Sequence, residues 1–184
     1  MNYVYNRQTP RAQWHHYNGG DYFVTICTKN REHYFGKVVN DTVQLTKIGE
    51  FLKLQIENTE KIRNGDVTIP IYVIMPNHVH LIIAVRTDAV RTDAVRTDAV
   101  RTDAVRPYEG GCKFGMQSKN LPSIIRGIKC SVTKYALQNN IPFGWQSRYN
   151  DHIIRNQTEM NNIAAYIENN PQMWYRDRNN PPTR

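Results

Sequence analysis

The sequence predicts an α+β sandwich in which helices pack against an antiparallel sheet. Apolar, β-branched segments typical of strands are interleaved with segments that have the 3.6-residue periodicity of amphipathic helices. The chain has 184 residues, of which 40% are hydrophobic, so it has the length of one domain and enough apolar material for a core. We therefore expect a single domain over residues 1–184.

The first half of the chain predicts three strands and one helix. Residues 22–28 are an apolar, largely β-branched run that follows a glycine turn, which predicts a strand. Residues 46–63 predict a helix whose apolar positions, Ile62 among them, fall roughly on one side. Residues 67–75 and 78–85 are two further apolar runs, and the short turn between them predicts a hairpin.

The second half predicts two helices and a short strand. Residues 121–138 have an apolar and a basic side, which indicates an amphipathic helix, and residues 152–154 predict a strand. A last helix is expected to begin after Asn156, because an Asn side chain can cap a helix and Glu159 stands at the third helical position. Pro171 then ends this helix.

Residues 86–105 are four identical copies of Arg-Thr-Asp-Ala-Val. A period of five matches neither a helix nor a strand, so the Ala-Val pairs form no continuous buried stripe. Each copy carries one Arg and one Asp, so the repeat adds nothing to the net charge of +8. We interpret it as an insertion in a loop, without a catalytic role.

The net charge of +8 favours a polyanionic partner, although an ordinary solvated basic surface is the alternative. Basic and aromatic residues gather near both ends of the chain, and this combination is typical of single-stranded nucleic acid binding. No run approaches the roughly 18 apolar residues of a membrane span, and no secretory leader is evident, so we expect a cytoplasmic protein. Cys27, Cys112 and Cys130 are too widely spaced for a zinc knuckle and are assigned no chemistry.

His78 and His80 are the residues that most directly indicate chemistry. Successive side chains of a strand point to opposite faces, so two histidines separated by one residue project from the same face. Two adjacent imidazoles can hold a divalent cation and leave coordination positions open for a substrate. The alternative is that one histidine forms a hydrogen bond in the core and the other is solvated.

The last predicted helix carries a second polar pair. Asn170 falls on the apolar face that is expected to pack on the sheet, and Tyr166 lies one turn earlier at the edge of that face. An amide aimed at the two histidines is a candidate third metal ligand, and the phenol is a candidate nucleophile. Alternatively, Asn170 only caps the helix before Pro171 and Tyr166 only borders the core.

Five sequence blocks together resemble a known family. They are Tyr22-Phe23-Val24-Thr25-Ile26-Cys27-Thr28-Lys29-Asn30-Arg31, Met75-Pro76-Asn77-His78-Val79-His80, Ile124-Ile125-Arg126-Gly127-Ile128-Lys129, Trp145-Gln146-Ser147-Arg148-Tyr149-Asn150-Asp151-His152-Ile153-Ile154-Arg155-Asn156 and Tyr166-Ile167-Glu168-Asn169-Asn170-Pro171. In these blocks, and in their order, the chain resembles the REP-associated tyrosine transposases, a branch of the single-tyrosine transposases among the His-hydrophobic-His (HUH) endonucleases. The resemblance covers nearly the whole chain apart from the repeat.

The resemblance implies a ferredoxin-like antiparallel sheet with packed helices, the fold of HUH transposases. It implies a divalent metal on His78 and His80, Tyr166 as the nucleophile, and Asn170 at the position that often completes the metal site. The implied activity is cleavage and transfer of single-stranded DNA at a hairpin, through a 5′-phosphotyrosine intermediate and without a nucleotide cofactor. Imidazole and oxygen ligands favour Mg²⁺ or Mn²⁺. Tyr149 is the rival tyrosine, but its position in the Trp-x-x-x-Tyr block indicates a structural role.

DNA contacts are expected from the basic side of the second helix, at Arg126, Lys129 and Lys134, with His152 and Arg155 as further candidates. Two alternatives remain: a domesticated hairpin-binding protein without activity, and a nickase that initiates replication or transfer. The two histidines and the tyrosine together weigh against the first, and the short chain weighs against the second. The recognised hairpin and the oligomeric state are left open.

Overall fold

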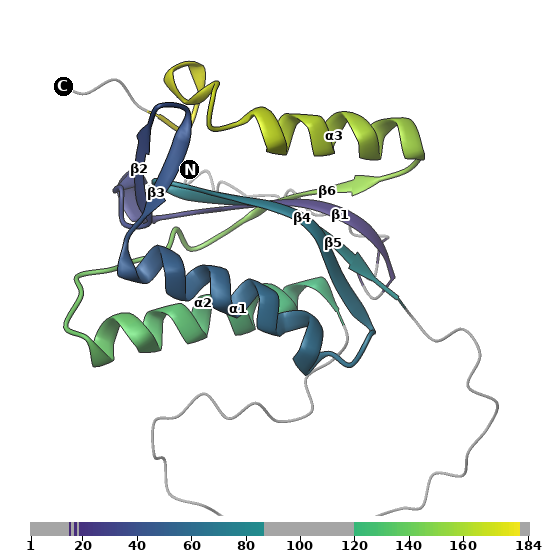
Figure 1. Ribbon diagram of the computed structural model, residues 1–184. Helices are drawn as coiled ribbons and strands as arrows, with labels where there is room; N and C mark the ends of the chain where they lie inside the picture. The colour runs from purple at the N-terminus through teal and green to yellow at the C-terminus, as the bar shows by residue number, and fades with distance from the viewer. Residues whose placement is uncertain (1–14, 16, 18, 87–119, 181–184) are drawn as a thin grey trace, which may run out of the picture.

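A four-stranded antiparallel sheet forms the centre of the computed structural model, which describes residues 15, 17, 19–86 and 120–180 (Figure 1). The strands lie in the order β4 (Val67–Met75), β5 (His78–Val85), β1 (Gly20–Cys27) and β6 (Asn150–Ile154). In the chain, α1 (Lys47–Ile62) connects β1 to β4, and α2 (Leu121–Gln138) comes between β5 and β6. This is the βαββαβ order of a ferredoxin-like fold, and every neighbouring pair of strands is antiparallel, so the predicted fold class is confirmed.

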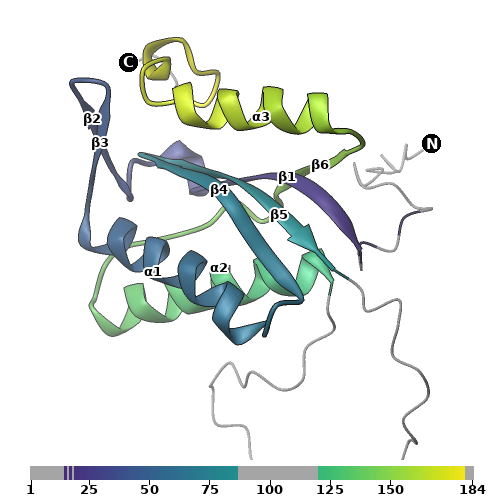
Figure 2. The same ribbon diagram turned by 45° about the vertical axis from the view of Figure 1, so that its right-hand side comes forward.

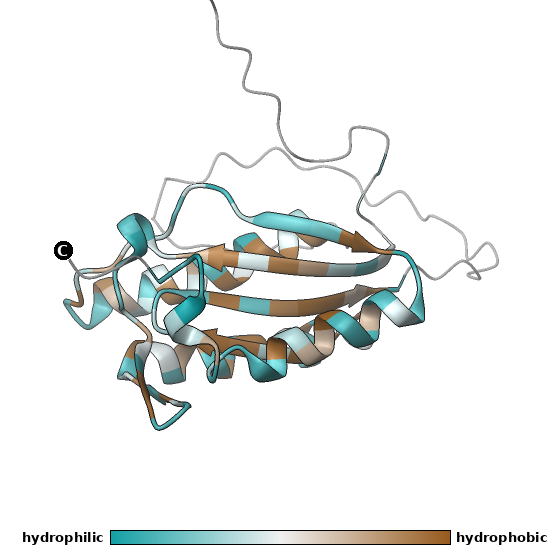
Figure 3. Ribbon diagram, turned by 90° about the horizontal axis from the view of Figure 1, so that it is seen from above, coloured by the Kyte–Doolittle hydropathy of each residue, from teal (hydrophilic) through white to brown (hydrophobic). Residues whose placement is uncertain are grey.

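The three α-helices of the described residues cover the two faces of the sheet unequally. Helices α1 and α2 lie side by side on one face, and α3 (Gln157–Asn169) lies alone on the other (Figures 1 and 2). The larger core lies between the sheet and the α1–α2 layer, whereas a smaller cluster of Ile82, Ile154 and Ile167 lies under α3. Figure 3 shows hydrophobic residues concentrated along the strands between these layers.

Strand β5 shows how the sequence divides its side chains between these layers. Val79, Leu81 and Ile83 belong to the larger core under α1 and α2, while Ile82 belongs to the cluster under α3. Because side chains alternate along a strand, His78 and His80 share the face of Ile82 and project toward α3. The hairpin from β4 to β5 fixes the register by pairing Met75 with His78.

The helix caps follow from short side chains that accept hydrogen bonds from the first helical turn. Thr46 caps α1 by accepting from the backbone N–H of Gly49, and Asn156 caps α3 by accepting from that of Glu159 at 2.8 Å. The predicted cap of α3 is therefore confirmed. The Glu159 carboxylate accepts a hydrogen bond from the backbone N–H of Arg155 at 2.8 Å, and not from that of Asn156 as in a standard capping box.

The structure differs from the sequence prediction in several elements. A hairpin of β2 (Gly36–Val39) and β3 (Thr42–Leu45) precedes α1, and short 3-10 helices span Lys29–Arg31 (η1) and Trp174–Arg176 (η2). None of these four elements was predicted, because runs of three or four residues give too little periodicity.

Two further predictions concern Ile62 and the Arg-Thr-Asp-Ala-Val repeat. Ile62 was expected on the packed side of its helix but is 61% exposed, because it is the last residue of α1 and no further turn covers it. The repeat lies outside the described residues except for Arg86, whose guanidinium is 3.2 Å from the Asp21 carboxylate. Among the described helices, none combines the length and apolar character needed to cross a membrane.

Candidate functional site

His78 and His80 lie together at the beginning of β5, on the face that α3 covers. Their ring centroids are 4.5 Å apart, and both side chains are almost completely buried. The strand period predicted this shared face, and the structure brings the two imidazoles together as expected.

Each imidazole is oriented by a hydrogen bond at its Nδ1 atom. Nδ1 of His80 lies 2.8 Å from Oγ1 of Thr25, its partner on β1, and Nδ1 of His78 lies 2.8 Å from Oδ1 of Asn77. These contacts leave the Nε2 atoms for the interior of the site. A hydrogen bond on the remote nitrogen is the usual arrangement of a metal-binding histidine, because it fixes both the ring and the tautomer.

Both histidines are held in the neutral form that binds metals. Burial, together with the positive charges of Arg31 and Arg178, lowers the pKa of His78 to about 3. Burial also lowers the pKa of His80 to about 3, with His78 as the next contribution. At neutral pH the two side chains therefore offer lone pairs, not positive charges.

Tyr166 comes from α3 and reaches the same point. Its hydroxyl lies 3.3 Å from Nε2 of His80, and its ring packs edge-on against Phe23. The side chain is 45% exposed, so a substrate can approach it from solvent. Burial and then the charge of Asp177 raise the pKa of Tyr166, while a hydrogen bond from the Asn170 side chain opposes them. The phenol is therefore neutral at pH 7 and needs activation to act as a nucleophile.

Asn170 occupies the C-terminal cap position of α3, one turn after Tyr166. Its side chain is 3% exposed, and its Oδ1 atom has no hydrogen-bond partner among the described residues. The predicted inward direction of this amide is what the structure shows, and it places an oxygen atom in the same buried region as the histidines.

Asp177 also reaches the site, and sequence reasoning missed it. After η2 the chain folds back so that Oδ2 of Asp177 lies 3.6 Å from Nε2 of His78, with its side chain 3% exposed. One ligand atom each from His78, His80 and Asp177 can be chosen so that all lie within 4.8 Å of one another. No local pattern pointed to this residue, because its position depends on how the segment after α3 returns to the sheet.

The arrangement fits a divalent cation. Several buried side-chain atoms of the described residues have no hydrogen-bond partner, and three of them belong to this site: Nε2 of His78, Oδ1 of Asn170 and Oδ2 of Asp177. Buried polar atoms are normally satisfied, and imidazole, amide and carboxylate atoms are all metal ligands. A cavity of about 540 Å³ opens beside them, lined by Tyr166, Asn170, Asp177 and also by Arg178.

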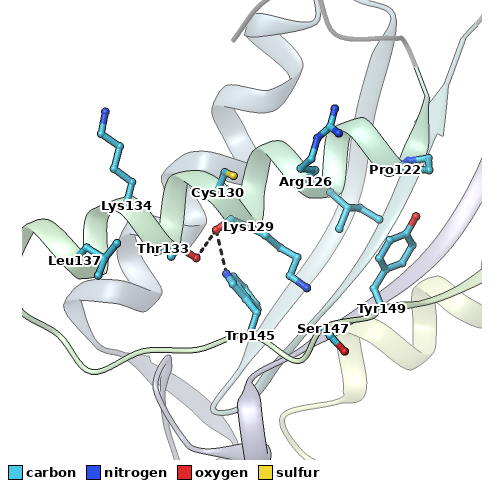
Figure 4. Close-up of a pocket in the computed structure, with 11 residues that line it drawn as sticks. Pro122, Arg126, Lys129, Cys130, Thr133, Lys134, Leu137, Trp145, Ser147 and Tyr149 are labelled. Carbon is cyan, nitrogen blue, oxygen red and sulfur yellow. Dashed lines mark hydrogen bonds between the residues drawn. The ribbon is translucent and has the colours of Figure 1, made fainter. Parts of the chain in front are cut away.

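The predicted DNA-contacting residues of α2 lie away from this site. Arg126, Lys129 and Lys134 line a second cavity of about 540 Å³ on the opposite layer, together with Trp145 and Tyr149 (Figure 4). Arg126 and Lys134 are exposed. Lys129 is half-buried and donates to the backbone oxygen of Gln146 at 2.6 Å.

Two other expectations concern β6 and the residues next to it. Tyr149 packs against the larger core on the α2 side, apart from the two histidines, which agrees with a structural role. His152 belongs to β6, and its Nε2 is 2.6 Å from the carboxylate of Glu159 in the first turn of α3. Arg155 is exposed just before this helix. Among the described residues, neither forms a hydrogen bond or ring contact with Tyr166.

Comparison with known proteins gives one sequence relative and one structural likeness of note. No family model matches the chain. A protein of Haemophilus influenzae, described as uncharacterized, is 32% identical over 188 residues, which cover 95% of this chain and 93% of the relative. The solved structure of a REP-associated tyrosine transposase bound to a REP hairpin superposes with a TM-score of 0.55. It is 20% identical, and the match covers 90% of this chain and 74% of that one, so the likeness shows the shared fold.

Proposed function

The chain belongs to the same family as the Haemophilus influenzae protein and has the fold of a REP-associated tyrosine transposase, and on this premise we propose that it cleaves and transfers DNA strands. The observation that carries the proposal is the position of the Tyr166 hydroxyl, 3.3 Å from Nε2 of His80, within a group of residues suited to a metal. A nucleophile beside a cation site is what phosphodiester cleavage by a tyrosine requires.

His78, His80 and Asn170 would hold Mg²⁺ or Mn²⁺. Once bound, the cation would supply Lewis-acid polarisation of the scissile phosphate, which makes its phosphorus atom more electrophilic. The protein contributes the preorganisation: Thr25 and Asn77 fix the two imidazole rings before any substrate arrives.

Tyr166 is the proposed nucleophile. Its phenolic oxygen forms a bond to phosphorus and loses its proton to solvent, while the bond between phosphorus and the 3′ oxygen breaks and that oxygen takes up a proton from solvent. The products are a 5′-phosphotyrosine and a free 3′-hydroxyl. The hydrogen bond from Asn170 favours the phenolate form of Tyr166, and so assists the attack. A second 3′-hydroxyl can reverse the step and join strands, so no nucleotide cofactor is required.

The proposed substrate is single-stranded DNA beside a hairpin. Tyr166 borders a cavity that exposed Arg176 and Arg178 also line, so a negatively charged backbone can reach the hydroxyl. We assign Arg126 and Lys134 on the far layer, with Lys129 between them, to contacts with more distant parts of the same DNA. Such contacts predict affinity that falls as salt concentration rises.

Two remaining assignments complete the proposal. His152 and Arg155 are offered as phosphate contacts at the beginning of α3. Residues 1–184 are treated as one domain in which residues 86–105 are an inserted loop.

Covalent trapping tests the proposed function. Labelled single-stranded hairpin DNA from beside the protein's own gene is incubated with the protein and Mg²⁺ or Mn²⁺, and a complex that survives denaturation is sought on a gel. Tyr166→Phe should abolish the complex and leave DNA affinity nearly intact, because only the hydroxyl is removed. Tyr149→Phe is the matched control and should form the complex. The reverse pattern would show that the nucleophile is assigned to the wrong tyrosine.

A further inference from the structure

We infer that Asp177 is a direct ligand of the divalent cation, so that the segment after α3 supplies a carboxylate to the metal site. The inference rests on the proposed function, which places the cation at His78, His80 and Asn170. It adds a charged ligand from a part of the chain that no sequence motif indicated.

The first support is the separation between Asp177 and His78. Oδ2 of Asp177 lies 3.6 Å from Nε2 of His78, which is too long for a hydrogen bond. Two ligand atoms that each lie about 2.1 Å from one ion, at angles of about 90° to 120°, are separated by about 3.0 to 3.6 Å. The observed distance therefore matches two ligands that share a cation.

The second support is the way in which each ligand is oriented. Oδ1 of Asp177 accepts from the backbone N–H of Asn179 at 2.6 Å, which leaves Oδ2 directed at the histidines. Thr25 and Asn77 orient the two imidazoles in the same manner, through the atom that faces away from the site. All three residues are thus held by their outer atom, which is the pattern of ligands with a hydrogen-bonded outer shell.

The third support is the burial of a carboxylate oxygen without a hydrogen-bond donor. Among the described residues Oδ2 of Asp177 has no partner, and the neighbouring Nε2 of His78 and Oδ1 of Asn170 have none either. Desolvating a carboxylate is costly unless a positive charge or donors compensate for it. A divalent cation between Asp177 and the histidines would satisfy both Oδ2 of Asp177 and Nε2 of His78.

Hydrogen bonds hold the segment that carries Asp177 beside the same site. The Asn77 side chain donates to the backbone oxygen of Asn179 at 2.6 Å, and Arg31 donates to the Asn179 side chain at 2.5 Å. Because Asn77 also contacts His78, one residue links a histidine ligand to the segment after α3. The carboxylate is therefore positioned by the fold itself and not by a free chain end.

The additional ligand changes the charge of the centre. Two imidazoles and an amide are neutral, whereas the Asp177 carboxylate reduces the charge of the centre by one. An oxygen anion also favours hard cations such as Mg²⁺ and Mn²⁺ over soft ones.

Mn²⁺ binding in the absence of DNA tests this inference without any measurement of activity. Isothermal titration calorimetry is carried out on the full chain and on Asp177→Asn, which keeps the size of the side chain and an acceptor for Asn179. We expect Asp177→Asn to bind Mn²⁺ at least about tenfold more weakly, since loss even of an outer-shell partner costs about 10- to 100-fold. Glu168→Gln is the matched control, because it removes the same charge from an exposed position on α3 and should bind as wild type does.

The controls separate this inference from the proposed function. Thermal melting without metal establishes that each variant is folded, and Asp177→Glu, which keeps the charge but moves the oxygens, should also bind more weakly than wild type. If either folded Asp177 variant binds Mn²⁺ as tightly as wild type while His78→Ala does not bind it, the inference is overturned and the histidine site stands. If wild type binds no Mn²⁺, both the inference and the proposed metal site are overturned.

Discussion

Replacing Thr25 by Val should weaken the metal site without touching any ligand. Thr25 is 3% exposed on β1, and its Oγ1 lies 2.8 Å from Nδ1 of His80. For Nε2 of His80 to bind a cation, the ring proton must reside on Nδ1, where Thr25 accepts it. Val has nearly the same shape and is also β-branched, so the strand is preserved while the acceptor is lost.

The size of the effect follows from the buried hydrogen bond. Leaving the Nδ1 proton of His80 without an acceptor costs about 1–3 kcal/mol of the free energy of unfolding. For a chain of this length that corresponds to a fall in Tm of about 2–12 °C. Metal affinity should fall about 10- to 100-fold, because an unanchored ring no longer presents Nε2 in a fixed direction.

Thermal melting and Mn²⁺ titration of the same sample measure both effects. The control is Thr59→Val in α1, which also removes a buried hydroxyl but one that donates only to the helix carbonyl of Gln55, on the other layer. It should leave Mn²⁺ affinity unchanged. If Thr25→Val binds Mn²⁺ as tightly as wild type, then Thr25 does not orient His80, and the account of the preorganised imidazoles is wrong.

Three other outcomes are expected. His80→Ala should eliminate metal-dependent cleavage. Asn170→Ala should only weaken Mn²⁺ affinity, because water can replace an amide oxygen. If the two variants lose cleavage activity and Mn²⁺ affinity to the same extent, this expectation is wrong. Ile167→Ala should lower the free energy of unfolding by about 2–5 kcal/mol through a cavity in the cluster under α3, as measured by denaturant unfolding, and a loss below about 1 kcal/mol would show that α3 packs loosely. Deleting two copies of the repeat in residues 86–105 should change stability by less than about 1 kcal/mol and leave cleavage intact, since loop closure entropy varies slowly with length. A large fall in melting temperature or in cleavage activity would mean that the repeat packs on the domain or binds DNA.

The parts of the fold that were predictable are those that local periodicity determines. The ranges of β4, β5 and α2 agree with the predicted 67–75, 78–85 and 121–138, because the two strands are long apolar runs and the helix has a clear 3.6-residue pattern. The shared face of His78 and His80 follows from the same local rule.

The parts that were not predictable depend on contacts between distant segments. Asp177 reaches His78 only because the chain turns back after α3 and Asn179 is held by Asn77, a residue 102 positions earlier. The Lys129 ammonium likewise donates to the backbone oxygen of Gln146, 17 positions later, and so contacts the neighbouring segment. Charge and amphipathicity do not reveal such contacts, because they describe one element at a time.

Mapping the covalent link tests the central claim most directly. After incubation with hairpin DNA and Mg²⁺ or Mn²⁺, the complex is digested with nuclease and trypsin, and the peptides are analysed by mass spectrometry. The tryptic peptide of residues 156–176 contains both Tyr166 and Tyr175, so fragment spectra are needed to locate the modification. We expect a nucleotide joined through its 5′ phosphate to Tyr166. A nucleotide on Tyr149 or Tyr175, or no covalent nucleotide on any tyrosine of the wild-type protein, would contradict the account.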